Sequence, residues 1–385
     1  MQDEPLWSVL AVNAGSSSVK FALFEETVPG GPLRMRADGA LPAGASADAI
    51  AAWMEEQGGK GYAVSAIGHR IVHGGERYHG PAAVDDALLA ALHDLEPFAP
   101  AHLPEALRLI EALRARFPGV PQTVSFDTAF HRTMPRIAQI LPVPRRYERY
   151  GVRRYGFHGL SYTFLMHTLA HTEDGRGSQG KVVLAHLGSG ASMAAVRDGH
   201  PLDTSMAFTP ASGIPMSTRA GDLDPGIAAF LARKEGMTID GWSDMVAKES
   251  GLLGIAETTA DMKELLAREH EDVRAAEAVE YFCYRARQQI GAYAATMGGI
   301  DTLVFAGGMG DQAPAIRARI CQGLAFLGIA IDEARNESGN AFSPGEIKMI
   351  GKEGAACKVL VIHTDEAAVI AEEAYAVSKG SLRTK

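Results

Sequence analysis

Two turns rich in glycine and serine, each flanked by strand-like runs, have residue types that can bind an anion. The first spans Asn13 to Ser18, lies between apolar runs at 9–12 and 19–24, and is followed by Lys20. Backbone N–H groups and hydroxyls of such a turn donate hydrogen bonds to phosphate, and a lysine adds positive charge. A single Gly-Ser turn is more often a solvated hairpin loop. The run 181–199 repeats the order of strand, Gly-Ser turn and strand, and this second copy favours phosphate binding.

The repetition predicts a duplicated core of two related halves, each opening with a hairpin. The two runs align with Asn13 opposite either Leu187 or His186, depending on a slip of one residue.

Further polar residues follow apolar strands or precede helices. Arg70 ends a strand-like run at 63–75, and Asp127 ends another that begins near 121. His158 lies between glycines before an amphipathic helix, and Arg219 lies in a long loop of small residues and prolines at 203–226. An arginine at a strand end can bind an anion, but pairing with a structural carboxylate is an equally good interpretation. His158 could likewise bond a loop carbonyl.

Two segments near the C-terminus have the order strand, turn, helix. Residues 302–328 place a glycine-rich turn before a helix, which is a second kind of phosphate or nucleotide site. Residues 358–377 place Asp365 and Glu366 between a strand and the last helix, where carboxylates could hold a hydrated cation.

The elements expected to position these residues are short strands alternating with amphipathic helices. Helices are predicted at 48–56, 103–117, 224–234, 240–249 and 271–297, and another begins after Thr259 or Asp261 as its cap. The segment after the first hairpin is predicted to be loop with one edge strand.

The composition is that of an ordinary globular protein. With 385 residues, 46% of them hydrophobic, the chain is long enough for two domains. Its net charge of -9 argues against a nucleic-acid or anionic membrane surface. Cys283, Cys321 and Cys357 have no CxxC spacing, so they predict neither a zinc motif nor a disulfide framework, and a reducing cytoplasm fits. Neither a signal peptide nor a membrane span is predicted.

Two other functions fit parts of the sequence. Gly308-Met-Gly310-Asp-Gln-Ala313 matches GxGxxA, with Asp332 about twenty residues on, as in dinucleotide-binding oxidoreductases. That motif normally opens a βαβ domain, whereas here it lies late in the chain and leaves the first turn unexplained. A nucleotide-gated interaction protein on an actin-like fold would share both hairpins but would not need arginines at two strand and loop ends.

Six motifs together make the chain resemble the acetate and propionate kinase family over nearly its whole length. They are N-x-G-S-S-S-x-K at 13–20, G-H-R-x-V-H-G-G at 68–75, F-D-T-A-F-H at 126–131, Y-G-F-H-G at 155–159, T-R-x-G-D-x-D-P-G at 218–226 and G-G-x-G at 307–310. The resemblance implies an α/β, duplicated actin-like (ribonuclease H-like) fold. It has two domains with mixed sheets flanked by helices and an active-site cleft between them. The implied domains are 1–128 with 365–385, and 129–364.

The resemblance also implies reversible, ATP-dependent phosphorylation of acetate, and of propionate, by direct in-line transfer. Arg70 would hold the substrate carboxylate, while Arg219 and His158 would stabilise the transferring phosphoryl group. Asn13 and Glu366 would serve Mg²⁺, which Mn²⁺ could replace. Asp127 is the family's catalytic acid or base. Because a carboxylate substrate is already ionised at neutral pH, we expect Asp127 instead to orient magnesium or His158.

The remaining implied residues form two groups. The acyl pocket would consist of Val72, Ala101, Phe157 and Pro210. The nucleotide would contact Lys20, His186, Leu187, Gly188, Ser189, Gly190, Asp261, Met262, Lys263, Gly308, Met309, Gly310, Asp311 and Gln312. The family also implies a homodimer, a cytoplasmic location, and no nucleic-acid or membrane partner.

Departures from the family's motifs occur near both substrates. On the nucleotide side, Ser189, Lys263 and Asp311-Gln312 replace Asn, Arg and Glu-Asn. On the acyl side, Ala101 replaces a leucine and Tyr162 replaces a histidine. The smaller Ala101 predicts room for one more methylene than acetate carries, hence good use of propionate.

Overall fold

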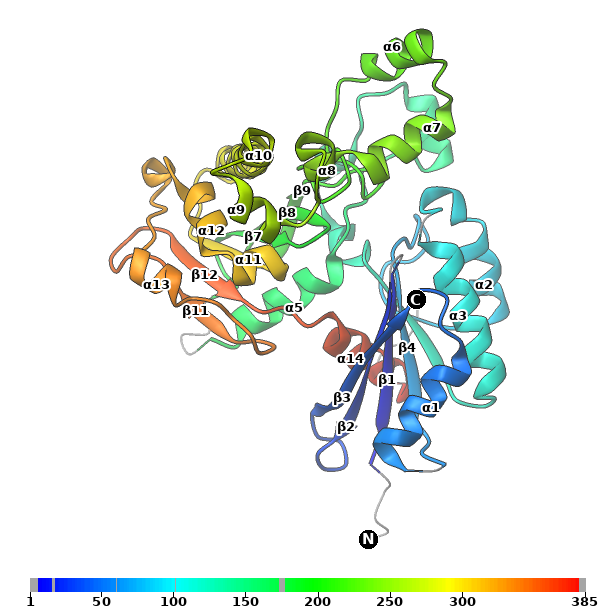
Figure 1. The fold of residues 1–385 in the computed structure, drawn as a ribbon. Helices are drawn as coiled ribbons and strands as arrows, with labels where there is room; N and C mark the ends of the chain where they lie inside the picture. The colour runs from blue at the N-terminus through cyan, green and yellow to red at the C-terminus, as the bar shows by residue number, and fades with distance from the viewer. Residues whose placement is uncertain (1–5, 16–17, 60, 101, 173–176, 381–385) are drawn as a thin grey trace. The chain divides into compact units, whose positions relative to one another are not determined.

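The computed structural model describes residues 6–15, 18–59, 61–100, 102–172 and 177–380. The chain forms two compact units, which we call unit 1 (residues 1–132 with 365–385) and unit 2 (residues 133–364). Figure 1 shows the last helix, α14, beside the first strands of unit 1. Ser16 and Ser17 of the predicted first turn, and Ala101 of the predicted acyl pocket, lie outside the described residues.

Unit 1 contains a mixed six-stranded sheet of order β3-β2-β1-β4-β6-β5. Strands β1 and β2 form the predicted hairpin, β3 is the predicted edge strand, and β1, β4 and β6 are parallel. The bounds are β1 Ser8–Ala14, β2 Ser18–Glu26, β3 Leu33–Pro42, β4 Ala66–Ile71, β5 Ala82–Ala83 and β6 Gln122–Phe126.

Unit 2 repeats this topology strand for strand. Its sheet has the order β11-β12-β10-β7-β8-β9, in which β7 and β8 form the second predicted hairpin and β7, β10 and β12 are parallel. The bounds are β7 Lys181–Leu187, β8 Ala191–Arg197, β9 His200–Thr204, β10 Thr302–Ala306, β11 Ile347–Met349 and β12 Lys358–Ile362. The duplicated fold is therefore confirmed.

The two hairpins also decide the one-residue slip. The last pair of the first hairpin is Ala14 with Val19, and that of the second is Leu187 with Ala191. Aligning the two strand ends sets Asn13 opposite His186, so these two residues occupy matching positions in the repeat.

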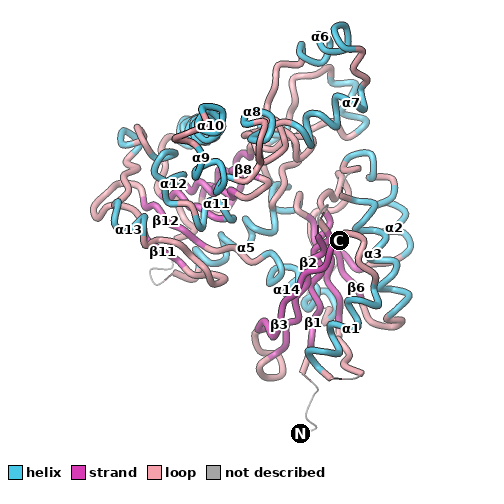
Figure 2. The backbone as a smooth tube through the Cα atoms, viewed as in Figure 1, coloured by secondary structure: helices cyan, strands magenta, loops and turns pink. Residues whose placement is uncertain are grey.

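Helices cover the sheet of unit 1 on both faces. Helix α14 packs against β1, β4 and β6, and α1 to α3 lie on the other side (Figures 1 and 2). The bounds are α1 Ala47–Gly58, α2 Asp86–His93, α3 Leu103–Arg116 and α14 Glu366–Ser378. The buried carboxylate of Glu26 accepts hydrogen bonds from Tyr375 and Lys379, which fastens the end of α14 to the hairpin.

Unit 2 holds the remaining helices. The longest, α10, begins after its cap Asp272, ends at Gly298, and buries Val279, Phe282, Ile290 and Tyr293 as its periodicity predicts. The bounds are α4 Arg136–Gln139, α5 Gly159–Ala170, α6 Gly226–Glu235, α7 Ile239–Asp244, α8 Gly251–Ala256, α9 Met262–Arg268, α10 Val273–Met297, α11 Gly307–Gln312, α12 Pro314–Cys321 and α13 Glu333–Glu337.

One element differs from the sequence-based expectation. The predicted glycine turn before a helix is itself helical, because α11 begins at Gly307. Gly307 has φ of +76°, and a Cβ there would lie 2.9 Å from the Leu187 carbonyl carbon, so only glycine lets the helix begin this close to β7. Among the described helices, none is long and apolar enough to span a membrane.

Candidate active site

Four predicted site residues of unit 1 meet at one end of its sheet. Asn13 is near the end of β1, Arg70 near the end of β4, Asp127 directly after β6, and Glu366 at the start of α14. Arg70 donates to Asp127 through Nε at 2.9 Å and Nη2 at 2.5 Å, and to Asn13 Oδ1 through Nη1 at 3.1 Å. Asn13 Nδ2 in turn donates to Glu366 Oε2 at 3.1 Å. The carboxyl ends of parallel strands thus bring together residues far apart in sequence.

Burial and neighbouring charges act in opposite directions on the pKa values of Arg70 and Asp127. Asp127 is 1% exposed, and burial raises its pKa while the Arg70 guanidinium acts in the opposite direction. Burial alone would lower the pKa of Arg70, but the charges of Asp127 and Glu366 outweigh it and raise that pKa. Arg70 is therefore held as a cation in a fixed orientation.

Of the two interpretations of Arg70, the structure shows pairing with a carboxylate, and anion binding stays a prediction. Arg70 is a carboxylate-paired arginine, yet the described hydrogen bonds use three of the five N–H groups of a guanidinium. Two N–H groups remain for a ligand carboxylate. The contact of Asp127 is with Arg70, so its expected role of orienting magnesium or His158 stays a prediction.

The cluster also offers oxygen atoms suited to a hydrated divalent cation. Glu366 supplies a carboxylate, and Asn13, whose Nδ2 donates to Glu366 Oε2, also has an amide oxygen, which accepts from Arg70 Nη1. Mg²⁺ is usually held by one or two carboxylates together with waters and substrate phosphates, so this donor set fits it. Within the described residues, no group of three or more His, Cys, Asp or Glu side chains is arranged to hold a metal ion.

In unit 2, a guanidinium and an imidazole ring converge on the second Gly-Ser turn. An ideal Cβ built on Gly190 would lie 3.2 Å from both Arg219 Nη2 and His158 Nε2. Glycine at this position therefore lets both groups approach the backbone of the turn. Arg219 Nη1 donates to the Pro210 carbonyl at 2.8 Å, which fixes the side chain.

The loop that carries Arg219 is packed against neighbouring backbone. The N–H of Ser217 donates to the Ser189 carbonyl at 3.1 Å, which joins this loop to the Gly-Ser turn. A Cβ at Gly251, where φ is +62°, would lie 2.6 Å from the Arg219 carbonyl oxygen. The long loop is thus held by main-chain contacts on both sides of its arginine.

His158 is the residue before α5 and has φ of +59°, a left-handed conformation uncommon for a residue with a side chain. Its Nδ1 lies 2.9 Å from Ser192 Oγ. Its ring stacks on that of His186 with centroids 4.4 Å apart, and His186 Nδ1 lies 2.8 Å from Ser161 Oγ. Sequence reasoning missed Ser192, although a serine within the apolar run of β8 is a detectable signal of a buried polar contact.

The predicted nucleotide residues fall into separate groups. Leu187, Gly188 and Ser189 continue from His186 into the Gly-Ser turn, whose Gly188 N–H donates to the Gly190 carbonyl. Asp261 caps α9 by accepting from the N–H groups of Lys263 and Glu264, and Met262 is buried. Lys20 is exposed on β2 opposite Asn13.

The departures in the glycine helix α11 have structural partners. Asp311 is buried and its Oδ2 lies 2.7 Å from His363 Nδ1; burial raises the pKa of Asp311, and His363 opposes that shift. Gln312 donates to the Ala341 carbonyl at 2.6 Å. The buried Arg317, also missed from sequence, donates to the carbonyls of Gly310 and Asp311 at 2.9 and 3.0 Å. These contacts hold the C-terminal end of α11, while Gly308 is exposed and Met309 half-buried.

The predicted acyl-pocket residues are described only in part. Val72 in unit 1 and Phe157 in unit 2 are buried, and Pro210 is half-buried. The pocket itself stays a prediction.

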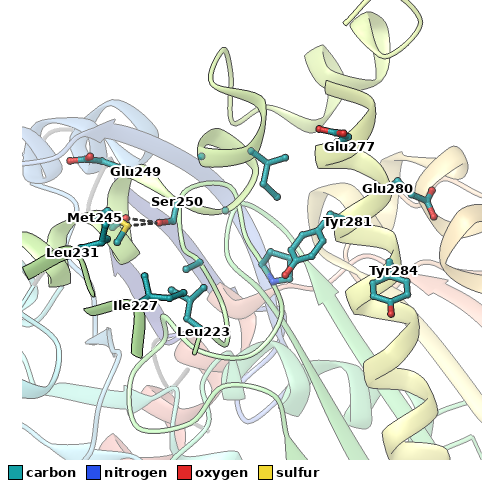
Figure 3. Close-up of a pocket in the computed structure, with 15 residues that line it drawn as sticks. Leu223, Ile227, Leu231, Met245, Glu249, Ser250, Glu277, Glu280, Tyr281 and Tyr284 are labelled. Carbon is teal, nitrogen blue, oxygen red and sulfur yellow. Dashed lines mark hydrogen bonds between the residues drawn. The ribbon is translucent and has the colours of Figure 1, made fainter. Parts of the chain in front are cut away.

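A different pocket, of about 870 Å³, lies in unit 2 (Figure 3). Leu223, Ile227 and Leu231 line one side, and Tyr281 and Tyr284 of α10 line another. Its lining is mainly apolar, unlike the polar clusters described above.

Comparisons with known proteins show which family the chain belongs to. The model of the Acetokinase family matches residues 46–372. An acetate kinase of Methylocella silvestris is 39% identical over 404 aligned residues, which cover 96% of this chain and 97% of that protein. The crystal structure of Porphyromonas gingivalis acetate kinase superposes with a TM-score of 0.84 at 32% identity, covering 96% of this chain and 99% of that one. A propionate kinase from Francisella tularensis gives 0.84 at 30% identity and the same coverage. With both polar clusters and the duplicated fold in place, the chain belongs to the acetokinase family.

Proposed function

We propose that this chain catalyses reversible transfer of the γ-phosphoryl group of ATP to the carboxylate of acetate, and also of propionate, giving an acyl phosphate and ADP. Family membership supports the reaction, and relatives of both names support the two acids. The observation that carries the proposal is the convergence of Arg219 Nη2 and His158 Nε2 on Gly190. Two donors aimed at one turn suit the equatorial oxygens of a phosphoryl group in transfer.

Unit 1 would bind the acceptor. The remaining N–H groups of Arg70 would hold the substrate carboxylate, and Asp127 would keep the guanidinium charged and oriented. An oxygen of that carboxylate forms the new bond to phosphorus while the bond to the β–γ bridging oxygen breaks, and its electrons leave with ADP. No proton has to move, because a carboxylic acid of pKa near 4 is ionised at neutral pH. Positioning and charge neutralisation therefore account for catalysis.

Asn13 and Glu366 would hold Mg²⁺, whose charge neutralises the phosphates when it is bound. Lys20, opposite Asn13 in the hairpin, would contact the same phosphates. In unit 2 the segment 186–190 and the exposed Gly308 of α11 would line the nucleotide. The acyl pocket would include Val72, Ala101, Phe157 and Pro210, all of which have apolar side chains.

The reaction is tested by trapping the acyl phosphate with hydroxylamine in the presence of ATP and magnesium, using acetate, propionate and butyrate. We expect hydroxamate from acetate and propionate, and none without magnesium. An absence of hydroxamate from every acid would contradict the proposal. Tight binding of NADH would favour the oxidoreductase, and nucleotide binding without turnover would favour the interaction protein.

We also propose that the chain forms a homodimer through the 870 Å³ pocket of unit 2. Helices α6 and α7 and the turn that follows have no buried residue, and Phe230 of α6 is 53% exposed. Helix α6 ends in Arg233 and Lys234, whereas Glu277 and Glu280 of α10 line the pocket. The surface thus carries an exposed apolar side chain, an apolar pocket, and both basic and acidic residues. Such a surface can be complementary to a second copy of itself, as a two-fold interface requires.

Light scattering during size-exclusion chromatography tests the dimer. Phe230→Glu places a charge in the interface and should give a monomer, whereas Phe326→Glu, at a site that is 80% exposed outside the pocket lining, should leave the dimer intact. A dimer that survives Phe230→Glu would exclude this surface. The three free, buried cysteines support the proposal that the enzyme works in the reducing cytoplasm.

A further inference from the structure

A chain of two hydrogen bonds runs from Tyr162 to the ring of His158. Tyr162 Oη lies 2.5 Å from Ser192 Oγ, and Ser192 Oγ lies 2.9 Å from His158 Nδ1. Tyr162 and Ser192 are fully buried, and His158 is 8% exposed. The chain therefore connects two fully buried hydroxyls to the ring that the proposed function places at the phosphoryl group.

We propose that Ser192 is a positioning residue that holds the neutral ring of His158 as the Nε2–H tautomer, and that Tyr162 sets the direction of the Ser192 hydroxyl. The inference rests on the proposed role of His158 at the transferring phosphoryl group. It assigns a role in the reaction to Ser192 and Tyr162, neither of which would contact a substrate.

One direction of the chain starts from the tyrosine hydroxyl as the donor, and counting protons then fixes the tautomer of His158. Burial raises the pKa of the Tyr162 hydroxyl, so it keeps its proton and can donate to Ser192 Oγ. Ser192 has a single proton and then donates it to His158 Nδ1. The proton of a neutral imidazole must therefore be on Nε2, the atom directed at Gly190.

The reverse direction would be unfavourable at this site. If Ser192 donated to Tyr162, His158 would carry its proton on Nδ1 and would direct the Nε2 lone pair at the turn. A lone pair facing the oxygens of a phosphoryl group is repelled, whereas an N–H donor is attracted.

The stacked ring of His186 provides a comparison within the same site. Ser161 Oγ donates to Thr364 Oγ1 at 2.9 Å, so towards His186 Nδ1 it acts as an acceptor. His186 therefore carries a proton on Nδ1, opposite to the arrangement inferred for His158. The two rings have the same kind of partner but different tautomers, because their serines are bonded to different second residues.

Nitrogen-15 spectra of the full-length protein, labelled at histidine, test the assignment directly. Histidine nitrogens that carry a proton differ strongly in chemical shift from those that do not, and a His158→Gln sample identifies the His158 signals. We expect the proton on Nε2 in the wild type. Ser192→Ala should give a mixture of tautomers at His158, Ser192→Thr should restore the single form, and Ser161→Ala should leave His158 unchanged.

Kinetics separate positioning from a merely structural role. Ser192→Ala should lower kcat roughly tenfold or more, with the KM values for ATP and acetate within about twofold of the wild type, and Ser192→Thr should recover most of the loss. If Ser192→Ala fails to fold, Tyr162→Phe is the alternative. This variant keeps the serine hydroxyl but removes the donor that sets the direction of its hydrogen bond. It should also give mixed tautomers and a lower kcat.

Two outcomes would overturn different parts of the argument. A wild-type His158 with its proton on Nδ1, or a tautomer unchanged by Ser192→Ala and Tyr162→Phe, would overturn the hydrogen-bond chain. A tautomer that changes while kcat does not would show that His158 does not act on the phosphoryl group, and would overturn its proposed function.

Discussion

The two arginines of the site are fixed by different kinds of partner. Arg70 is held by the charge of Asp127 and by Asn13, whereas Arg219 donates to the main-chain carbonyl of Pro210. Removing Arg70 would leave the buried carboxylate of Asp127 without its counter-charge, a loss that costs stability as well as function.

We expect Arg219→Ala to lower kcat by roughly a hundredfold or more with a modest change in KM, because a cation facing the transferring group acts mainly in the transition state. Arg70→Ala should in addition raise the KM for acetate. Arg70→Lys is the control for stability, since it keeps the charge beside Asp127 but loses the planar fork and should still raise that KM. Steady-state kinetics with both substrates decide the matter. The same kinetic profile in the Arg219 and Arg70 variants would refute this division of roles.

Ala101 gives a prediction about acyl specificity that rests on sequence. The family's leucine at this position is larger by three carbons, and one extra buried methylene is worth about 0.8 kcal/mol, or about fourfold in kcat/KM. Propionate should therefore be used nearly as well as acetate, and Ala101→Leu should lower propionate turnover more than acetate turnover. Measurement of kcat/KM for both acids in both proteins is the test. Strong acetate selectivity in the wild type that Ala101→Leu leaves unchanged would argue against a vacant pocket.

At the scale of elements, the glycine helix α11 shows how neighbouring glycines serve different purposes. A Cβ on Gly308 would meet nothing within 4 Å, and the residue is exposed. A Cβ on Gly310 would instead pack 3.4 Å from the Phe305 backbone, inside the unit. Substitution by valine should therefore affect nucleotide binding at Gly308 and the stability of the fold at Gly310.

Gly308→Val should raise the KM for ATP with little effect on that for acetate, because its side chain extends into the space proposed for the nucleotide. Gly310→Val should mainly lower the melting temperature, since Val must fit against β10. The expected effect at Gly310 is therefore on the fold, although the family resemblance implies a nucleotide contact there. Kinetics combined with thermal unfolding distinguish the two. An unchanged KM for ATP in Gly308→Val would place the nucleotide elsewhere.

At the scale of the whole molecule, each unit has its own sheet and core, and unit 1 also buries two histidines close to its cluster. His69 is bonded to Gln122 and His73 accepts from the Gly75 N–H. Burial lowers the pKa of each to about 4. Both rings are therefore neutral in the folded unit at neutral pH.

Because these folded-state pKa values lie below the ordinary value of 6.5, both histidines favour the folded state above pH 6.5. This stability is lost as the pH falls from 6.5 to 4, by up to about 1.4 kcal/mol per pH unit for each ring. Urea unfolding between pH 7 and 4.5 should show this fall in the free energy of unfolding. His69→Gln should make the fall shallower, whereas the exposed His200→Gln should not. An equal slope in all three proteins would mean that other groups control the acid response.

The sequence alone determined the features that depend on neighbouring residues. Apolar runs on either side of Gly-Ser turns predicted both hairpins, the 3.6-residue period predicted α3 and α10, and Asp261 was one of two predicted caps for the helix that is α9. The strand ends that carry Arg70 and Asp127 were predictable for the same reason. Resemblance of motifs then supplied the family.

The tertiary structure decided which of these residues meet. Arg70 and Asp127 are 57 positions apart, and Asn13 and Glu366 are 353 apart, so their pairing depends on strand order and on the return of α14. The same holds for the contact of Ser192 with His158, and for the start of α11 at Gly307, where a Cβ would clash with the Leu187 backbone. Local propensity specifies an element, but only register and packing between distant elements specify its partners.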